Sequence, residues 1–176
     1  MIGIDKSLPF KPIRIAILTV SDTRSFATDT SGDILQGRVE DAGHIVAARE
    51  LKRDDLYDVR TIVSEWISSP VIDAVIITGG TGLTGRDITV SAVRPLFEKE
   101  IDGFSVVFHM VSYETIGLST LQSRACAGLA NNTFIFCLPG SNGAVKDGWD
   151  KVIRGQLDIR NKPCNFVSLI PRLKEK

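Results

Sequence analysis

Four glycines stand close together in the middle of the chain, within the segment TGGTGLTGRD (Thr78 to Asp87). Glycine adopts positive φ angles and lets a ligand approach the backbone, so successive amide groups in such a loop can converge on an anion. A carboxylate next to that anion repels phosphate, unless a divalent cation such as Mg²⁺ lies between them. The loop therefore predicts phosphate binding, with Asp87 at a metal. Two plainer interpretations stay open: the loop is only a packing turn, and Asp87 only caps the following helix.

Two familiar nucleotide-binding patterns match this loop in form but not in context. Gly80, Gly82 and Gly85 satisfy GxGxxG, but a dinucleotide fingerprint belongs to the first strand–helix turn and opens its helix directly. Gly80 to Gly85 also have Walker A spacing, but Arg86 and Asp87 stand where that motif needs Lys and then Ser or Thr. The spacing alone therefore identifies no class of nucleotide-binding protein.

The elements that must position this loop alternate between strand and helix. Apolar, β-branched runs predict strands at 13–20, 44–51, 71–78 and 133–138. Helical spacing predicts helices capped by Ser31, opened by Asp54 or Asp55, and at about 89–99, 104–116 and 144–157. Residues 119–130 receive no assignment. The alternation is typical of an α/β domain with a mostly parallel sheet and helices on both faces. We expect one domain over 1–176, with its core at about 12–157 and an extended tail at 158–176.

Three loops that follow predicted strands are rich in small and polar residues. They are Ser21 to Gly32, Thr78 to Asp87 and Pro139 to Val145. Ligands of open parallel sheets bind beyond the carboxyl ends of the strands, so we expect these loops to meet at one site.

Composition excludes several classes of protein. The chain has 176 residues, of which 43% are hydrophobic and 24% charged, as in globular domains rather than disordered or fibrous ones. Its 21 basic and 21 acidic residues balance, which argues against a general nucleic-acid binder. The apolar runs are too short to span a membrane, and the N-terminus lacks a signal pattern. Cys126, Cys137 and Cys164 form no CxxC pair, and we expect buried, reduced thiols in a cytoplasmic protein.

Taken together, the motifs resemble those of the MoaB/Mog family. TVSD, DTSG, TGGTGLTGRD, SR (Ser123 and Arg124) and LPGSNGAV follow one another in the order of that family, over about residues 12–157. The segments GLSTLQSRACAGLAN and RNKPCNF are more similar to the MoaB branch than to the Mog branch. The family comprises molybdopterin adenylyltransferases of molybdenum-cofactor biosynthesis and is related to the G domain of gephyrin.

The resemblance implies a fold, a reaction and partners. The fold is a three-layer α/β/α sandwich, and the chain assembles as a trimer, or as a hexamer on the MoaB side. The reaction is Mg²⁺-dependent transfer of AMP from ATP to molybdopterin, with release of pyrophosphate. A molybdate-insertion enzyme that uses the adenylated product is the implied further partner.

The resemblance also implies site residues at matching positions. Asp54 and Asp87 are the catalytic and metal-binding aspartates, Asp55 being a less good match than Asp54. The residues that hold nucleotide phosphates are Thr78, Gly79, Gly80, Thr81, Gly82 and Arg86. The residues at the pterin pocket are Ser21, Asp22, Ser112, Ser123, Pro139, Gly140 and Ser141. Ser141 and Asn142 stand where the family's PGNPxAV pattern has Asn and Pro.

The motifs are consistent with three different functions. An adenylyltransferase agrees with the presence of both Asp54 and Asp87. The alternative within the family is a weakly active or inactive relative that carries molybdopterin or a partner protein. A nucleotide-binding oxidoreductase agrees only with the glycine loop, and the missing dinucleotide context argues against it.

Overall fold

A computed structural model describes residues 2–175, and its centre is a sheet with the strand order β3-β2-β4-β7-β6-β5. The strands are β2 (Arg14–Val20), β3 (Ile45–Lys52), β4 (Ala74–Thr78), β5 (Lys99–Glu100), β6 (Cys126–Ala130) and β7 (Thr133–Leu138). β3, β2, β4 and β7 pair in parallel, whereas β6 and β5 form an antiparallel edge. The predicted α/β fold with a mostly parallel sheet is therefore confirmed.

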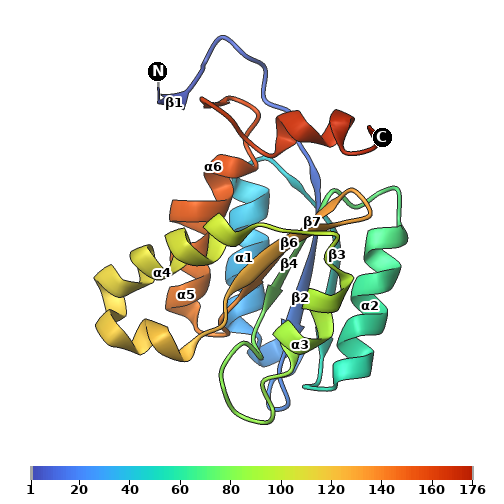
Figure 1. Cartoon of the computed structure of the whole chain (residues 1–176), viewed down its shortest axis with the longest axis vertical. Coiled ribbons are helices and arrows are strands. Elements are labelled where there is room, and N and C mark those ends of the chain that lie inside the picture. Colours follow the sequence, from blue (N-terminus) through green and yellow to red (C-terminus); the bar gives the residue numbers. More distant parts are fainter. Residues whose placement is uncertain (1, 176) are drawn as a thin grey trace.

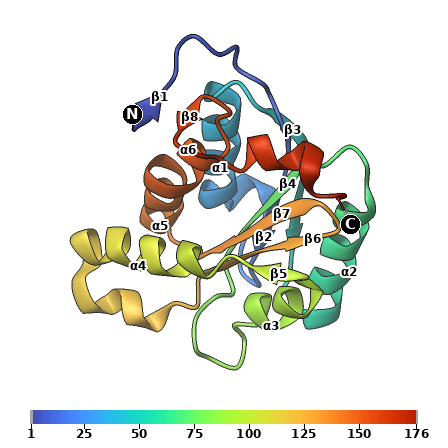
Figure 2. The ribbon, with the colours of Figure 1, turned by 45° about the horizontal axis from the view of Figure 1, so that its top comes forward.

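Helices cover both faces of the sheet (Figures 1 and 2). On one face lie α1 (Thr30–Asp41), α4 (Asp102–Ile116) and α5 (Asn142–Asp147), which continues through a π-helical turn at Gly148–Ile153 into α6 (Arg154–Gln156). On the other face lie α2 (Leu56–Ser68) and α3 (Thr89–Val93). Because side chains of a strand alternate between faces, β7 sends Phe134, Phe136 and Leu138 to the first core and Ile135 and Cys137 to the second.

The two tryptophans belong to these two cores. Trp149 is 1% exposed under α1 and α4, and Trp66 is 7% exposed beside α3. Both are therefore packing residues within this chain.

Several predicted boundaries are wrong. Asp29, not Ser31, caps α1, because its carboxylate accepts a hydrogen bond from the Gly32 amide at 3.0 Å. The strand before the glycine loop begins at Ala74 instead of residue 71. The helix after the loop does not reach residue 99: α3 gives way to a 3-10 turn at Arg94–Leu96, where the proline has no amide hydrogen to continue the helix.

The C-terminal tail is only partly extended, contrary to the prediction. Its strand β8 (Asn161–Lys162) pairs with β1 (Gly3–Ile4), and a 3-10 helix follows at Val167–Arg172. Phe166 stacks on Phe134 with ring centroids 4.8 Å apart, so the tail packs back on the core. The unassigned stretch 119–130 contains most of a 3-10 helix at Gly117–Gln122, and then β6.

The structure also tests the predictions about the cysteines and about membrane-spanning segments. Of the three thiols, Cys137 is buried, Cys126 is half-buried and Cys164 is exposed in the tail, so burial of all three was wrong. No helix among residues 2–175 has the length and apolar character needed to cross a membrane.

Candidate active site

The glycine loop is held open at the end of β4 by its backbone. Gly79 and Gly80 adopt φ angles of +100° and +63°, and a Cβ atom at Gly79 would overlap the carbonyl oxygen of Val20. The Gly79 amide donates to the Leu138 carbonyl at 3.0 Å, and the Thr89 hydroxyl donates to the Gly79 carbonyl at 2.7 Å. The next two amides, of Gly80 and Thr81, donate to no residue in the described part of the chain. They are available to an anion.

The loop borders a cavity of about 500 Å³ at the carboxyl ends of the parallel strands. All three post-strand loops that the sequence singles out contribute to its wall. The lining residues are Thr19 to Arg24, Ser31, Asp54, Thr78 to Gly82, Arg86, Asp87, Gln122, Ser123, Pro139 and Gly140. The parallel pairing of β2, β4 and β7 produces this convergence, because it brings the three loops to the same sheet edge.

Asp54 and Asp87 flank the same loop. A Cβ atom at Gly80 would lie 3.0 Å from Oδ1 of Asp54, and one at Gly82 would lie 2.7 Å from Oδ2 of Asp87. Asp54 is free for this position because its neighbour Asp55 caps α2, accepting from two amides of the first turn at 2.9 Å each. The ambiguity between the two aspartates is thus resolved: Asp55 caps the helix, and Asp54 lines the cavity.

Asp87 does not cap α3. Its carboxylate accepts the Thr84 hydroxyl at 2.6 Å and the Thr84 amide at 2.9 Å, and so closes the loop on itself. Burial raises the pKa of Asp87, but these hydrogen bonds and one from the Gly82 amide outweigh that effect, and the net pKa is lowered. Asp87 is therefore an anion at neutral pH, on the rim of the cavity.

Asp54 has the opposite electrostatic character. Burial raises its pKa, and the neighbouring charges of Asp22 and Asp87 raise it further. The Asp22 amide and the charge of Arg86 offset this rise only in part, and no side chain among residues 2–175 donates a hydrogen bond to the Asp54 carboxylate. Asp22, in contrast, has Arg86 as a partner, which lowers the pKa of Asp22. A half-buried carboxylate that has no side-chain donor and faces two other acids would be stabilised by a bound cation.

The donor set fits Mg²⁺ shared with a phosphate. Among the described residues, no group of three or more His, Cys, Asp or Glu could hold a metal ion unaided. Mg²⁺ in nucleotide sites commonly takes one or two carboxylates and completes its shell with water and substrate phosphates. Asp54 and Asp87, on either side of the free amides, match that pattern.

Most of the predicted site residues line this cavity. All six expected phosphate-binding residues do so, as do Ser21, Asp22, Ser123, Pro139 and Gly140 of the expected pterin set. Ser112 and Ser141 do not: Ser112 is buried on α4, and the Ser141 hydroxyl caps α5 by accepting the Ala144 amide at 3.2 Å.

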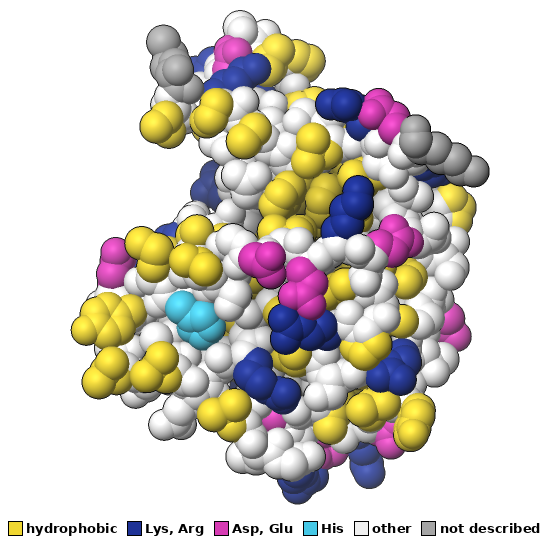
Figure 3. All heavy atoms as spheres, in the orientation of Figure 1, with side chains coloured by type: hydrophobic (Ala, Val, Ile, Leu, Met, Phe, Trp, Pro, Cys, Tyr) yellow, Lys and Arg dark blue, Asp and Glu magenta, His cyan; other side chains and the backbone are white. Residues whose placement is uncertain are grey.

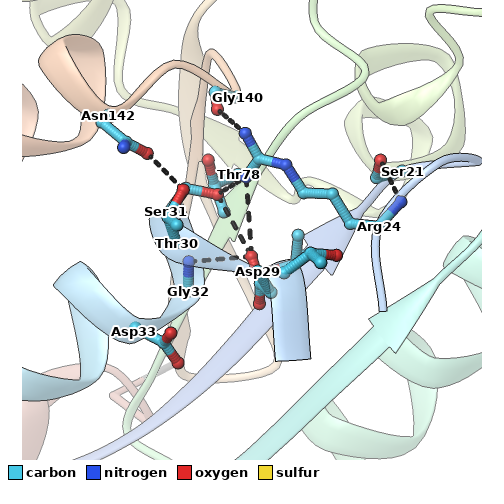
Figure 4. A network of polar contacts seen from close by, with 12 residues as sticks. Ser21, Arg24, Asp29, Thr30, Ser31, Gly32, Asp33, Thr78, Gly140 and Asn142 are labelled. Carbon is cyan, nitrogen blue, oxygen red and sulfur yellow. Dashed lines mark hydrogen bonds and ion pairs between the residues drawn. The ribbon is translucent and has the colours of Figure 1, made fainter. Parts of the chain in front are cut away.

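Sequence reasoning missed a polar network behind the cavity (Figure 4). Its centre is Asp29, which is 0% exposed and accepts the Thr19 hydroxyl at 2.7 Å and the Arg49 guanidinium at 3.0 Å. Arg24 donates to the Ser31 hydroxyl, and to the Gly140 carbonyl at 3.3 Å. Arg24 and Ser31 line the cavity, so the network presents a cation at its wall. The DTSG motif was the available signal, but the sequence analysis assigned only a helix-capping role to its Ser31 and none to Asp29.

Arg124 was also missed as part of the site. Its Nε donates to the Gly82 carbonyl at 2.7 Å, and its Nη2 donates to the Asp87 carbonyl. Its own amide donates to the Thr81 carbonyl at 2.8 Å. Arg124 thereby fixes the shape of the loop from outside the cavity.

Known proteins with similar sequence and structure agree with this architecture. A family model described as a probable molybdopterin binding domain matches residues 16–159. The molybdenum cofactor biosynthesis protein B of Escherichia coli (strain K12) is 50% identical over 169 residues, 96% of this chain and 98% of that protein. A crystal structure of a molybdenum cofactor biosynthesis protein B is 40% identical, with a TM-score of 0.81, over 84% of this chain and 92% of that one. The tungsten cofactor synthesizing protein MoaB from Pyrococcus furiosus is 37% identical, with a TM-score of 0.70, over 78% of this chain and 88% of that one.

Proposed function

The chain belongs to the MoaB/Mog family, whose shared domain is described as a probable molybdopterin binding domain, and from this premise we propose that it is a molybdopterin adenylyltransferase. The pathway is molybdenum cofactor biosynthesis. The reaction that we propose transfers AMP from ATP to the terminal phosphate of molybdopterin and requires Mg²⁺. The observation that carries the proposal is the placement of Asp54 and Asp87 on either side of two unpaired loop amides.

The chemistry needs two anions to meet. A phosphate oxygen of the pterin attacks the α-phosphorus of ATP, a new P–O bond forms, and the bond from that phosphorus to the β-phosphate bridging oxygen breaks to release pyrophosphate. A phosphate monoester has its second pKa near about 6, so the nucleophile is largely ionised at pH 7 and needs no general base. What the protein must supply is neutralisation of charge and alignment.

The residues of the cavity can supply both. The free amides of Gly80 and Thr81 donate to phosphate oxygens as negative charge develops on them. Asp54 and Asp87 would hold Mg²⁺, which supplies Lewis-acid stabilisation of the transferring and departing phosphates when bound. Arg24, which lines the cavity, can pair with a phosphate as a guanidinium does. We assign ATP phosphates to the loop, and the pterin to the side formed by Ser21 and Gly140.

The test is direct assay of the purified chain with ATP, Mg²⁺ and molybdopterin, followed by detection of adenylyl-molybdopterin and pyrophosphate. Asp54→Asn and Asp87→Asn should each lower turnover by about 10²–10³-fold, the loss typical of removing one preorganised group from a charged transition state. Asp55→Asn is the matched control, because it makes the same change next to Asp54, outside the cavity, and asparagine also caps helices. It should leave turnover unchanged.

Two results would contradict the proposal in different ways. Full activity in Asp54→Asn or Asp87→Asn would remove that residue from the mechanism. Tight molybdopterin binding by the unaltered chain, without AMP transfer under any Mg²⁺ and ATP concentration, would identify it as a carrier instead of an enzyme.

We also propose that the chain assembles with copies of itself through α4 and the 3-10 helix that follows it. Exposed apolar side chains gather over these two elements (Figure 3). They are Val106, Val107, Met110, Tyr113, Ile116, Leu118 and Leu121. Contiguous apolar surface of this kind marks contact sites in soluble proteins.

Sedimentation measures the assembly. The variant Met110→Glu with Leu118→Glu should convert the oligomer to monomers, because two charges would be buried in the contact. Val71→Glu replaces an exposed apolar residue elsewhere and should leave the oligomer intact. A monomeric unaltered chain would exclude the contact.

A further inference from the structure

Cys126 and Cys137 face each other across two neighbouring strands. In the antiparallel ladder of β6 and β7, Cys126 is the register partner of Cys137. Directly opposed residues of an antiparallel pair point to the same face, with Cα atoms about 4.5 or 5.5 Å apart according to the hydrogen-bonding pattern. A disulfide spans Cα separations of about 4.4–6.8 Å. Either pattern therefore gives a Cα separation that a disulfide can span.

The two thiols differ in access to solvent. Cys137 is 0% exposed in the core beneath α2 and α3. Cys126 is half-buried and lines a separate cavity of about 350 Å³, whose wall also includes Arg94 and Arg124. Neither thiol lines the cavity at the glycine loop, so the proposed transferase reaction uses neither of them.

The surroundings of the two thiols also shift their pKa values in opposite directions. A hydrogen bond from the Cys137 thiol lowers the pKa of Cys126, and the charges of Arg94 and Arg124 lower it further against the opposing effects of burial and Glu100. The same hydrogen bond and complete burial raise the pKa of Cys137. Oxidant-sensitive cysteines commonly combine thiolate character and access with a second thiol close by that resolves the oxidised form.

We propose that Cys126 and Cys137 form a reversible redox site, in which a hydroperoxide oxidises the pair to a cross-strand disulfide. The Cys126 thiolate attacks one peroxide oxygen, the O–O bond breaks, and the hydroxide that leaves takes up the thiol proton as water. The Cys137 sulfur then attacks the sulfenic sulfur of Cys126, the S–O bond breaks, and a second water leaves with the Cys137 proton. Two thiols and one hydrogen peroxide thus become one disulfide and two waters.

The position of the pair connects it to the glycine loop. Two residues before Cys126, the Arg124 amide donates to the Thr81 carbonyl at 2.8 Å, and directly after Cys137, the Leu138 carbonyl accepts the Gly79 amide at 3.0 Å. The disulfide would join two strands whose adjoining residues hold the first half of the loop, at Gly79 and at Thr81.

The experiment treats the purified full-length chain with graded hydrogen peroxide, unfolds it in an alkylating agent and digests it with trypsin. Both cysteines lie on one tryptic peptide, residues 125–146, because no lysine or arginine lies between Arg124 and Lys146. That peptide should lose two thiol hydrogens and both alkylation sites, and dithiothreitol should restore them. Cys164 is the internal control: it is exposed, lies on a different tryptic peptide and should stay alkylatable at peroxide levels that oxidise the pair.

The variant Cys126→Ser separates the roles by exchanging one atom of a half-buried side chain at the edge of the core. It should leave Cys137 reduced and alkylatable after unfolding at every peroxide level that oxidises the pair in the unaltered chain. Stable sulfinic acid on Cys126 with Cys137 still a free thiol would overturn the proposal. So would a peptide 125–146 that stays reduced while Cys164 is oxidised.

Discussion

Replacement of Asp29 by alanine should be unusually costly for a single substitution, because the Asp29 carboxylate satisfies several buried donors at once. The side chain is 0% exposed and accepts from the Thr19 hydroxyl at 2.7 Å, the Gly32 amide at 3.0 Å and Arg49 at 3.0 Å. Alanine removes all of these acceptors and leaves the donors inside the protein.

The contributions can be added from the contacts. Loss of the α1 cap costs about 1 kcal/mol. The Thr19 hydroxyl, in a residue 1% exposed, loses its acceptor, which costs about 1–3 kcal/mol. Breaking a buried ion pair usually costs about 3–5 kcal/mol, but Arg49 keeps Asp33 at 2.7 Å, so we count only about 1 kcal/mol for it. The sum is about 4 kcal/mol, a large share of the roughly 5–15 kcal/mol that stabilises a typical domain.

Urea and thermal unfolding followed by circular dichroism measure this loss. The melting temperature falls by about 2–4 °C per kcal/mol for a chain of this length, so the midpoint of thermal unfolding should fall by roughly 10 °C. Protein concentration must be held constant, since assembly raises apparent stability. Asp33→Ala is the matched control, because Asp33 contacts the same Arg49 nitrogen but its side chain is 59% exposed, and it should cost under about 1 kcal/mol. Equal losses in the two variants would refute the reasoning.

The pH dependence of the same variant gives an independent check. Burial raises the pKa of Asp29, but hydrogen bonds from Thr19, Gly32 and Arg49 outweigh it, and the net pKa lies below the ordinary value of 3.8. A carboxyl group with a lowered folded pKa stabilises the fold fully above the unfolded pKa, and this stability is lost as the pH falls through the folded pKa. The difference between the unaltered chain and Asp29→Ala should therefore be constant near neutrality and shrink below pH 3.8.

Three further predictions concern the cavity. Because burial raises the pKa of Asp54, its ionised form destabilises the fold, and Asp54→Asn should be more stable at pH 7 by a few tenths of a kcal/mol. Urea unfolding should show this gain shrink as the pH falls through the raised pKa and vanish below the unfolded value of 3.8. Gly79→Ala should cost about 1–3 kcal/mol by thermal unfolding and abolish nucleotide binding by calorimetry, because φ is +100° there, whereas Gly85→Ala meets no atom within 4 Å and should change stability by under about 0.5 kcal/mol. Arg124→Lys removes the two guanidinium hydrogen bonds to the Gly82 and Asp87 carbonyls, and it should raise the KM for ATP about tenfold with little change in melting temperature. An unchanged KM would show that the loop keeps its shape without that guanidinium.

Local sequence was sufficient for the strands that carry the site. The runs at 13–20 and 133–138 are almost wholly apolar because β2 and β7 are covered on both faces, so their pattern predicted β2 and β7 to within a residue. It was less reliable where tertiary contacts set the boundary. The helix after the glycine loop ends early at Pro95, and the chain then enters an edge strand of only two residues, which no periodicity can reveal.

By itself, the sequence determined the α/β class, the glycine loop and the three loops that border the cavity, because the carboxyl ends of parallel strands lie at the same edge of a sheet. Only the tertiary structure showed the separate positions of Asp54 and Asp55, since helical spacing left open which of them opens the helix: Asp55 caps α2, whereas Asp54 lies beside the glycine loop. Only the tertiary structure, too, joined Arg24, Asp29 and Arg49 into one buried network and set Cys126 against Cys137. Such pairings depend on strand register and on packing between distant segments, and local residue spacing predicts neither of them.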